Sequence, residues 1–146
     1  MSEDGGFLPA PVILDASVLT EAVRGDAGVL DLILGYDVAG QPLLMPALAV
    51  VAASLDMRSD DAAATLRGLE QLENVSVAPV QGADQAVRLA AVISRTGLDP
   101  WDAHVAMVAD AEVCSILTLD GRKWREHESD LDDRLHYVEI SDPDDS

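Results

Sequence analysis

The sequence predicts an α/β protein, a three-layer α/β/α sandwich around a mostly parallel sheet of four or five strands. Short apolar runs alternate with helical segments along the chain, and two of these runs, PVILDAS (11–17) and CSILTLDGR (114–122), end in an aspartate. Apolar runs of this kind are typical of parallel strands buried on both faces. Because such strands end at one edge of the sheet, where open α/β proteins bind ligands, we expect Asp15 and Asp120 to lie close together there.

The first half of the chain is expected to supply two strands and four helices. After the strand that ends at Asp15 come a helix over 18–24, a helix from 26 to about 35, an extended segment over 41–45, a helix over 46–57 and a helix from 59 to about 72. Asp26 and Ser59 suit helix N-caps, Pro46 suits a first helical turn and Gly35 suits a helix end. Apolar residues three and four apart give buried stripes: Val29, Leu30, Ile33 and Leu34, then Ala63, Leu66, Leu69 and Leu72.

The second half is expected to supply three more strands and three helices. In order, they are a strand over 74–80, a helix over 84–95, a helix over 101–112, a strand over 114–119, a short helix over 122–127 and a closing strand over 135–140. Gly97 ends the first of these helices and Pro100 begins the next. Asp102 falls in the first turn of that helix, where the helix dipole favours an anion.

Length and composition predict one compact domain. The chain has 146 residues with 49% hydrophobic content, and it contains no repeat or linker that would divide it. We expect a flexible N-terminus over 1–10, a folded domain over 11–140 and an acidic disordered tail over 141–146.

Cysteine usage and hydropathy favour a soluble cytoplasmic protein. Cys114 is the single cysteine, so no internal disulfide can form, which suits a reducing compartment. No signal-like segment opens the chain, and its longest apolar run, 43–55, is broken by Pro46 and is shorter than the roughly 20 residues of a membrane-spanning helix. We therefore expect no membrane association.

Charge limits the ways in which the protein could bind nucleic acid. The formal net charge is −18, and such a field repels a polyanion. Any RNA substrate would have to be held locally. Arg122, Lys123 and Arg125 are the nearest basic residues to Asp120, and they form either a phosphate-binding group or an ordinary solvated helix face.

Four motifs together resemble a PIN domain. VILDAS, MPALAVVAAS, LDPWDAHVAMVAD and ILTLDGR stand in the order and spacing of that family, and the resemblance covers nearly the whole chain. It implies a small α/β nuclease domain over 11–140, of the kind found in VapC-type toxins of bacterial toxin–antitoxin pairs. It implies further that Asp15, Asp102 and Asp120 form an acidic cluster, both catalytic and metal-binding, that holds Mg²⁺ or Mn²⁺ to cleave RNA. An antitoxin protein and a homodimer are the implied partners.

One position departs from the family pattern. Active members carry a glutamate about six residues into the helix that begins near Pro46, and this chain has Ala52 there. Asp56 is the nearest substitute, but it lies one helical turn, about 5.4 Å, further along the axis. Since ligands must approach to roughly 2.0–2.1 Å of Mg²⁺, a short side chain displaced by a turn is expected to miss the ion. Three aspartates can still hold one magnesium ion with water and substrate phosphate.

Each carboxylate also has a purely structural interpretation. Asp15 can cap a helix, Asp102 can pair with a helix dipole and Asp120 can form a turn before Gly121. Ser17 stands where a dehalogenase would have its second aspartate, and it can instead hydrogen-bond Asp15 or a metal-bound water. The remaining candidates, which lack metal-ligand or base-stacking patterns and are expected to be surface or packing residues, are His104, His127, His136, Trp101 and Trp124.

Two functions therefore follow from the sequence. The first is a divalent-metal-dependent ribonuclease of the PIN type, which would use a metal-bound water to hydrolyse a phosphodiester. The second is a catalytically inactive PIN-like module that works through protein contacts. Three convergent aspartates favour the first function, whereas Ala52 and the acidic surface favour the second.

Overall fold

A five-stranded, all-parallel sheet forms the centre of the protein, which confirms the predicted fold class. The computed structural model describes residues 9–112, 114–127 and 136–140. Segments 1–8 and 141–146, which cover the expected acidic tail and most of the expected flexible N-terminus, lie outside the described residues.

The strands and helices alternate as predicted. The strands are β1 (Val12–Leu14), β2 (Leu43–Pro46), β3 (Val75–Ala78), β4 (Ser115–Thr118) and β5 (Tyr137–Glu139). The helices are α1 (Ala16–Val23), α2 (Ala27–Val38), α3 (Ala47–Met57), α4 (Asp60–Glu70), α5 (Gly82–Thr96), α6 (Pro100–Glu112) and α7 (Gly121–Glu126). In the described part of the chain, no helix has both the length and the hydropathy needed to span a bilayer.

The central strand is β1, and the direction of strand addition reverses beside it. The strand order is β3-β2-β1-β4-β5, so the chain first extends the sheet on one side of β1 and later on the other. In β1, Val12 pairs with Leu43 of β2, and Leu14 pairs with Leu117 of β4. Ligands of open α/β sheets bind at the carboxyl edge where the strand order reverses. That position here is the space beyond β1 and β4.

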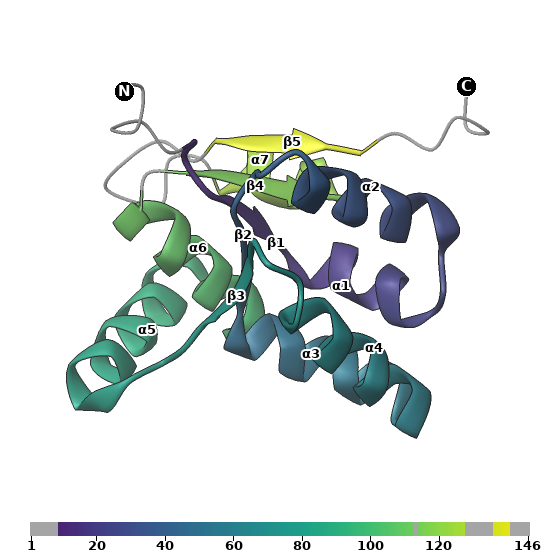
Figure 1. Ribbon diagram of the computed structural model, residues 1–146. Coiled ribbons are helices and arrows are strands. Elements are labelled where there is room, and N and C mark those ends of the chain that lie inside the picture. The colour runs from purple at the N-terminus through teal and green to yellow at the C-terminus, as the bar shows by residue number, and fades with distance from the viewer. Residues whose placement is uncertain (1–8, 113, 128–135, 141–146) are drawn as a thin grey trace.

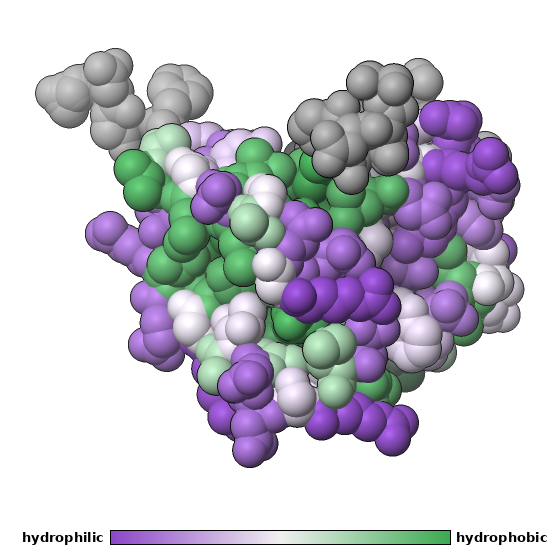
Figure 2. Space-filling view, turned by 90° about the vertical axis from the view of Figure 1, so that its right-hand side faces the viewer, coloured by the Kyte–Doolittle hydropathy of each residue, from purple (hydrophilic) through white to green (hydrophobic). Residues whose placement is uncertain are grey.

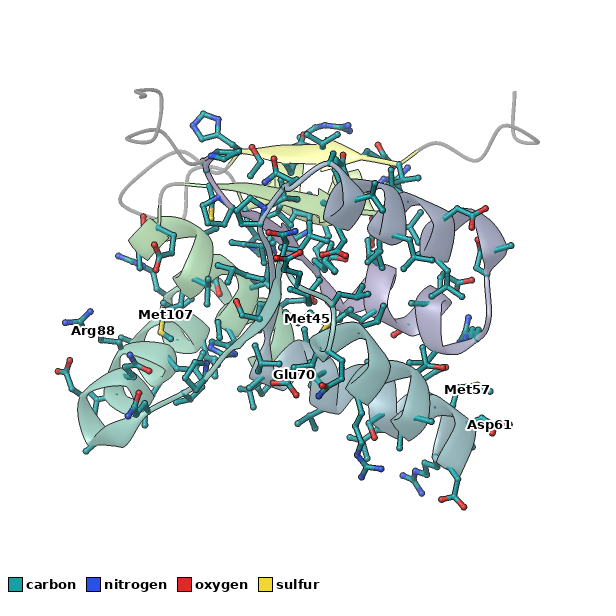
Figure 3. The ribbon with its side chains drawn as sticks, viewed as in Figure 1. Met45, Met57, Asp61, Glu70, Arg88 and Met107 are labelled. Atoms are coloured by element: carbon teal, nitrogen blue, oxygen red, sulfur yellow. The ribbon has the colours of Figure 1, made fainter. Side chains whose placement is uncertain are left out.

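Helices cover both faces of this sheet. Figure 1 shows α1 and α2 on one side of β1 and β2, and α5 and α6 on the other side. The strands are buried between these layers, and fully buried side chains come from each of the three inner strands: Ile13, Leu14, Leu43, Met45, Ile116 and Leu117. In Figure 3, Met45 lies within the body of the molecule, whereas Arg88 of α5 and Asp61 of α4 lie at its outside.

Helix α2 is longer than the sequence predicts. It passes through Gly35 and ends at Val38, so the predicted end at Gly35 is wrong. The half-buried Tyr36 packs against the core, which favours continuing the helix. The left-handed glycine that follows the helix is Gly40, with φ of 79°. Leu34, expected on the buried face, is exposed.

A histidine from α6 caps the N-terminus of α3. Pro46, the N-cap residue, makes no side-chain capping hydrogen bond. Instead, the Leu48 backbone N–H donates to Nδ1 of the buried His104 at 3.2 Å. Because Nδ1 accepts this bond, the neutral ring carries its proton on Nε2. Burial lowers the pKa of His104 below 6.5. His104 is therefore a packing residue, as predicted, and it also joins α6 to α3.

Candidate functional site

Asp15 lies at the carboxyl end of β1 and is completely buried. It is the N-cap of α1, and its Oδ1 accepts hydrogen bonds from the Val18 backbone N–H at 3.1 Å and from the Ser17 hydroxyl at 2.6 Å. Its Oδ2 accepts a hydrogen bond from Nε1 of Trp124 at 2.9 Å. Both carboxylate oxygens therefore already bond to donors from the protein.

Ser17 fastens the start of α1 to the end of β4. Its hydroxyl donates to Asp15 and accepts from the Leu119 backbone N–H at 2.9 Å. The Asp15 backbone N–H donates to the Leu117 carbonyl at 3.2 Å. These contacts hold the ends of the two neighbouring strands together, as the pattern of the two sequence motifs predicts.

Asp102 and Asp15 share one lysine. Nζ of Lys123 lies 3.0 Å from Oδ1 of Asp102 and 3.7 Å from Oδ2 of Asp15. The lysine side chain is 20% exposed, and the two carboxylates are 8% and 0% exposed respectively. Nζ also lies 5.1 Å from the centroid of the Trp124 ring. We refer to Asp15, Asp102 and Lys123 as the buried ion cluster.

The surroundings of Asp102 disfavour its ionised form in spite of Lys123. Burial is the largest influence, and it raises the pKa of Asp102 above 3.8. The ammonium group of Lys123 opposes this change through its charge and its hydrogen bond, whereas the negative charges of Asp15 and Asp99 add to it. Asp102 therefore depends on Lys123 for its counter-charge.

Asp120 has a different position from the other two predicted ligands. It is exposed, and it is the N-cap of α7, where its Oδ1 accepts from the Lys123 backbone N–H at 3.4 Å. The structure thus brings Asp15 and Asp102 together around Lys123 and leaves Asp120 at the neighbouring helix end. A capping role, the structural interpretation of a lone aspartate, describes the contacts of Asp120.

Neither α3 position considered for a fourth ligand belongs to the buried ion cluster. Ala52 is half-buried and packs against the hydrophobic core. Asp56 accepts two hydrogen bonds from the guanidinium group of Arg24, at 3.0 Å and 2.9 Å. That ion pair joins the end of α1 to the end of α3 at the protein surface.

The arrangement of these side chains does not fit a divalent cation. Among the residues that the structure describes, no three histidine, cysteine, aspartate or glutamate side chains lie close enough together to hold a metal ion. The two convergent carboxylates have an ammonium between them, and Asp15 is bonded further by an indole N–H and a hydroxyl. A hard cation bound to both carboxylates would have to displace the ammonium of Lys123.

Sequence reasoning missed two residues of this site. Lys123 was expected to hold phosphate or to lie on a solvated helix face, but its ammonium turns inward to Asp102. Trp124 was expected to be a packing residue, and it is fully buried, but it also donates to Asp15. The one available signal was that Lys123 is the only lysine in the chain.

Comparison with solved structures reveals the same architecture in two other proteins. One is a chain of VapBC2 from Rickettsia felis, whose structure is bound to a DNA fragment from the promoter. The match has a TM-score of 0.63 and 10% sequence identity, and it covers 90% of this chain and 99% of that one. The other is PAE2754 from Pyrobaculum aerophilum, with a TM-score of 0.52, 21% identity and coverage of 82% and 87% respectively.

The sequence itself has no such match. No known family model matches this chain, and no curated protein sequence matches it. At 10% and 21% identity, the structural likeness shows a shared fold. What the site does must be inferred from its own residues.

Proposed function

We propose that this chain, which has the fold of a PIN domain, is a PIN-like module that acts by binding a partner protein and whose acidic cluster does not hydrolyse RNA. One observation carries the proposal. The ammonium of Lys123 lies between the carboxylates of Asp15 and Asp102, where a nuclease of this fold would need a metal ion. The single positive charge of Lys123 offsets one of the two negative charges, and an ammonium supplies neither a Lewis acid nor a metal-bound water.

Two further features support an acidic cluster that does not hydrolyse RNA. The third aspartate, Asp120, is exposed and caps α7, and among the described residues it does not complete a three-ligand group with Asp15 and Asp102. The position of the family glutamate is Ala52, which contacts the core. The net charge of −18 also opposes approach of an RNA backbone, and Lys123 is directed to Asp102 rather than to solvent phosphate.

Surface apolar residues support a protein partner. On α2, Leu34 and Val38 are exposed and lie four residues apart, and on α3 the same is true of Val51 and Leu55. Residues four apart share a helix face, so each pair makes an apolar stripe on its helix. Figure 2 shows apolar side chains gathered beside strongly polar ones on one face of the molecule. A partner that buries such stripes next to an acidic surface would carry apolar and basic side chains.

The fold comparison supports a particular class of partner. A chain of VapBC2 shares this architecture. We therefore propose an antitoxin-like protein, encoded beside this chain, as the partner. We also propose that the chain forms a homodimer, as the resemblance to PIN domains implies. Sedimentation of the purified protein would measure its oligomeric state directly.

A metal-dependent ribonuclease is the second candidate. One observation favours it, namely that two buried carboxylates converge at the carboxyl edge of the sheet, where the strand order reverses. This candidate requires Mg²⁺ or Mn²⁺ to enter the cluster, with Lys123 turning away. It also requires Asp120 to turn toward the other two aspartates.

An RNA cleavage assay separates the two candidates. Purified protein is incubated with structured RNA and Mn²⁺, and Asp15→Asn is the matched variant because it removes the charge with little change of volume. We expect no cleavage above background in either protein. Cleavage that needs Mn²⁺ and disappears in Asp15→Asn would establish the ribonuclease. It would refute the proposal that the acidic cluster does not hydrolyse RNA.

Co-expression tests the proposed partner. The chain is produced together with the product of a small reading frame beside its gene, and complex formation is followed by size-exclusion chromatography. We expect a stable complex that Val38→Asp or Val51→Asp weakens. As a control, Val87→Asp changes an exposed valine on α5, away from both stripes. Failure of every neighbouring product to bind would contradict the proposed partner class.

A further inference from the structure

We infer that the Lys123 ammonium is a built-in counter-cation for the buried carboxyl groups of Asp15 and Asp102, so that the fold of this cluster does not depend on divalent ions. The inference rests on the proposed function, because a cluster that bound a catalytic metal would need that position free. It gives Lys123 a structural role, namely stabilisation of the two buried carboxyl groups.

Without a cation, burial of these two neighbouring carboxylates would be unfavourable. Asp15 is completely buried and Asp102 is nearly so, and their oxygens are close enough to share one ammonium. Two buried carboxylates that face each other repel, and each has lost most of its hydration. A cation or a proton must therefore accompany them into the folded state.

Lys123 supplies this cation. Within the described ranges, it is the only basic side chain that forms an ion pair with either carboxylate. Its neighbour Arg122, one position earlier on α7, is exposed. Since the chain contains no other lysine, no nearby lysine can replace Lys123 if it is changed.

Helix α7 fixes the position of the ammonium group. Trp124, the next residue, is fully buried and donates to Asp15. Asp120 accepts from the Lys123 backbone N–H and begins the helix. The backbone of Lys123 is thus held on both sides, so that the ammonium reaches Asp102 at 3.0 Å.

The test is thermal unfolding of Lys123→Met, which keeps a long flexible side chain without the charge. In excess EDTA, we expect its unfolding midpoint to fall by roughly 5–15 °C, since removing one partner of a buried pair leaves the other charge uncompensated. Arg122→Met is the matched control and should change the midpoint little. The wild-type midpoint should be the same in EDTA, millimolar Mg²⁺ and millimolar Mn²⁺, whereas Mn²⁺ should restore part of the loss in Lys123→Met.

Two further variants keep the inference testable if Lys123→Met does not fold. Lys123→Arg retains a cation and should lose less stability than Lys123→Met. The double variant Lys123→Met/Asp102→Asn removes one anion with the cation and should recover stability relative to the single variant. No recovery in the double variant, equal stability of Lys123→Met and wild type, or equal stabilisation of both by Mn²⁺ would overturn the inference.

These measurements contain no RNA, so a failure of the inference can be distinguished from a failure of the proposed function. Cleavage of RNA by the wild-type protein would refute the proposal that the acidic cluster does not hydrolyse RNA. The stability of Lys123→Met would still decide whether Lys123 acts as the counter-cation. A stable Lys123→Met that still fails to cleave RNA would refute only the role of Lys123.

Discussion

The indole N–H of Trp124 donates to Oδ2 of Asp15 at 2.9 Å, and both residues are completely buried. This bond joins the end of the central strand to the short helix α7. It fixes the orientation of the Asp15 carboxylate, whose other oxygen caps α1.

Trp124→Phe should destabilise the protein by about 1–3 kcal/mol, because it leaves a buried carboxylate oxygen without its donor. Urea unfolding measures the change, and the slope of the transition should stay the same if the native fold is kept. Trp101→Phe, at a half-buried position on α6, is the matched control and should cost less. Equal losses for the two substitutions would show that ring volume, rather than the hydrogen bond, determines the effect.

Asp102 should titrate above 3.8, because burial raises the pKa of its carboxyl group. The titration can be followed through the side-chain carbon chemical shift in NMR spectra. Lys123→Met should move the midpoint higher still, since the charge and hydrogen bond of Lys123 lower this pKa. A midpoint that is unchanged in Lys123→Met would contradict the contact between the two side chains in solution.

The contribution of neutral His104 to stability should be lost as the pH drops below about 6.5, the ordinary pKa of histidine. Burial holds the pKa of His104 below that value, so the unfolded chain takes up a proton first and acid favours unfolding. His104→Asn keeps a polar side chain at the position but cannot titrate, and it should reduce this pH dependence. His136→Asn, at an exposed position, serves as the control, and an unchanged slope in His104→Asn would refute the prediction.

Ala52→Glu should leave RNA intact, because one added carboxylate does not remove the ammonium of Lys123 from the other two. The same Mn²⁺-dependent cleavage assay measures the outcome, with Ala52→Gln as a neutral control of similar size. A marked gain of cleavage in the glutamate variant alone would show that the acidic cluster lacks only one ligand. The second candidate function would then become the better description.

Much of the fold could be predicted from the sequence, because parallel strands and capped helices leave local signals. Asp26 and Ser59 cap their helices as predicted, and Gly97 follows α5 with φ of 74°. Gly35 misled the prediction of α2, because the packing of Tyr36 on the core outweighs the weak helix propensity of glycine.

The site was less predictable because its contacts join distant residues. The convergence of Asp15 with the end of β4 follows from the strand pattern, which is visible in the sequence. The inward direction of Lys123 depends on how α7 packs. The sequence of such a short helix does not indicate which of its charged side chains faces the interior. The role of His104 was hidden for the same reason, since its acceptor serves α3 from another helix.

The central place of β1 has a consequence for how the chain folds. Trp124 follows Asp15 by 109 positions, and the pairing of β1 with β4 spans a similar length. Contacts of such high sequence separation slow folding, because a long loop must close before they form. During synthesis, one edge of β1 lacks its partner strand until β4 has left the ribosome, and an unpaired strand edge can pair with other chains and aggregate.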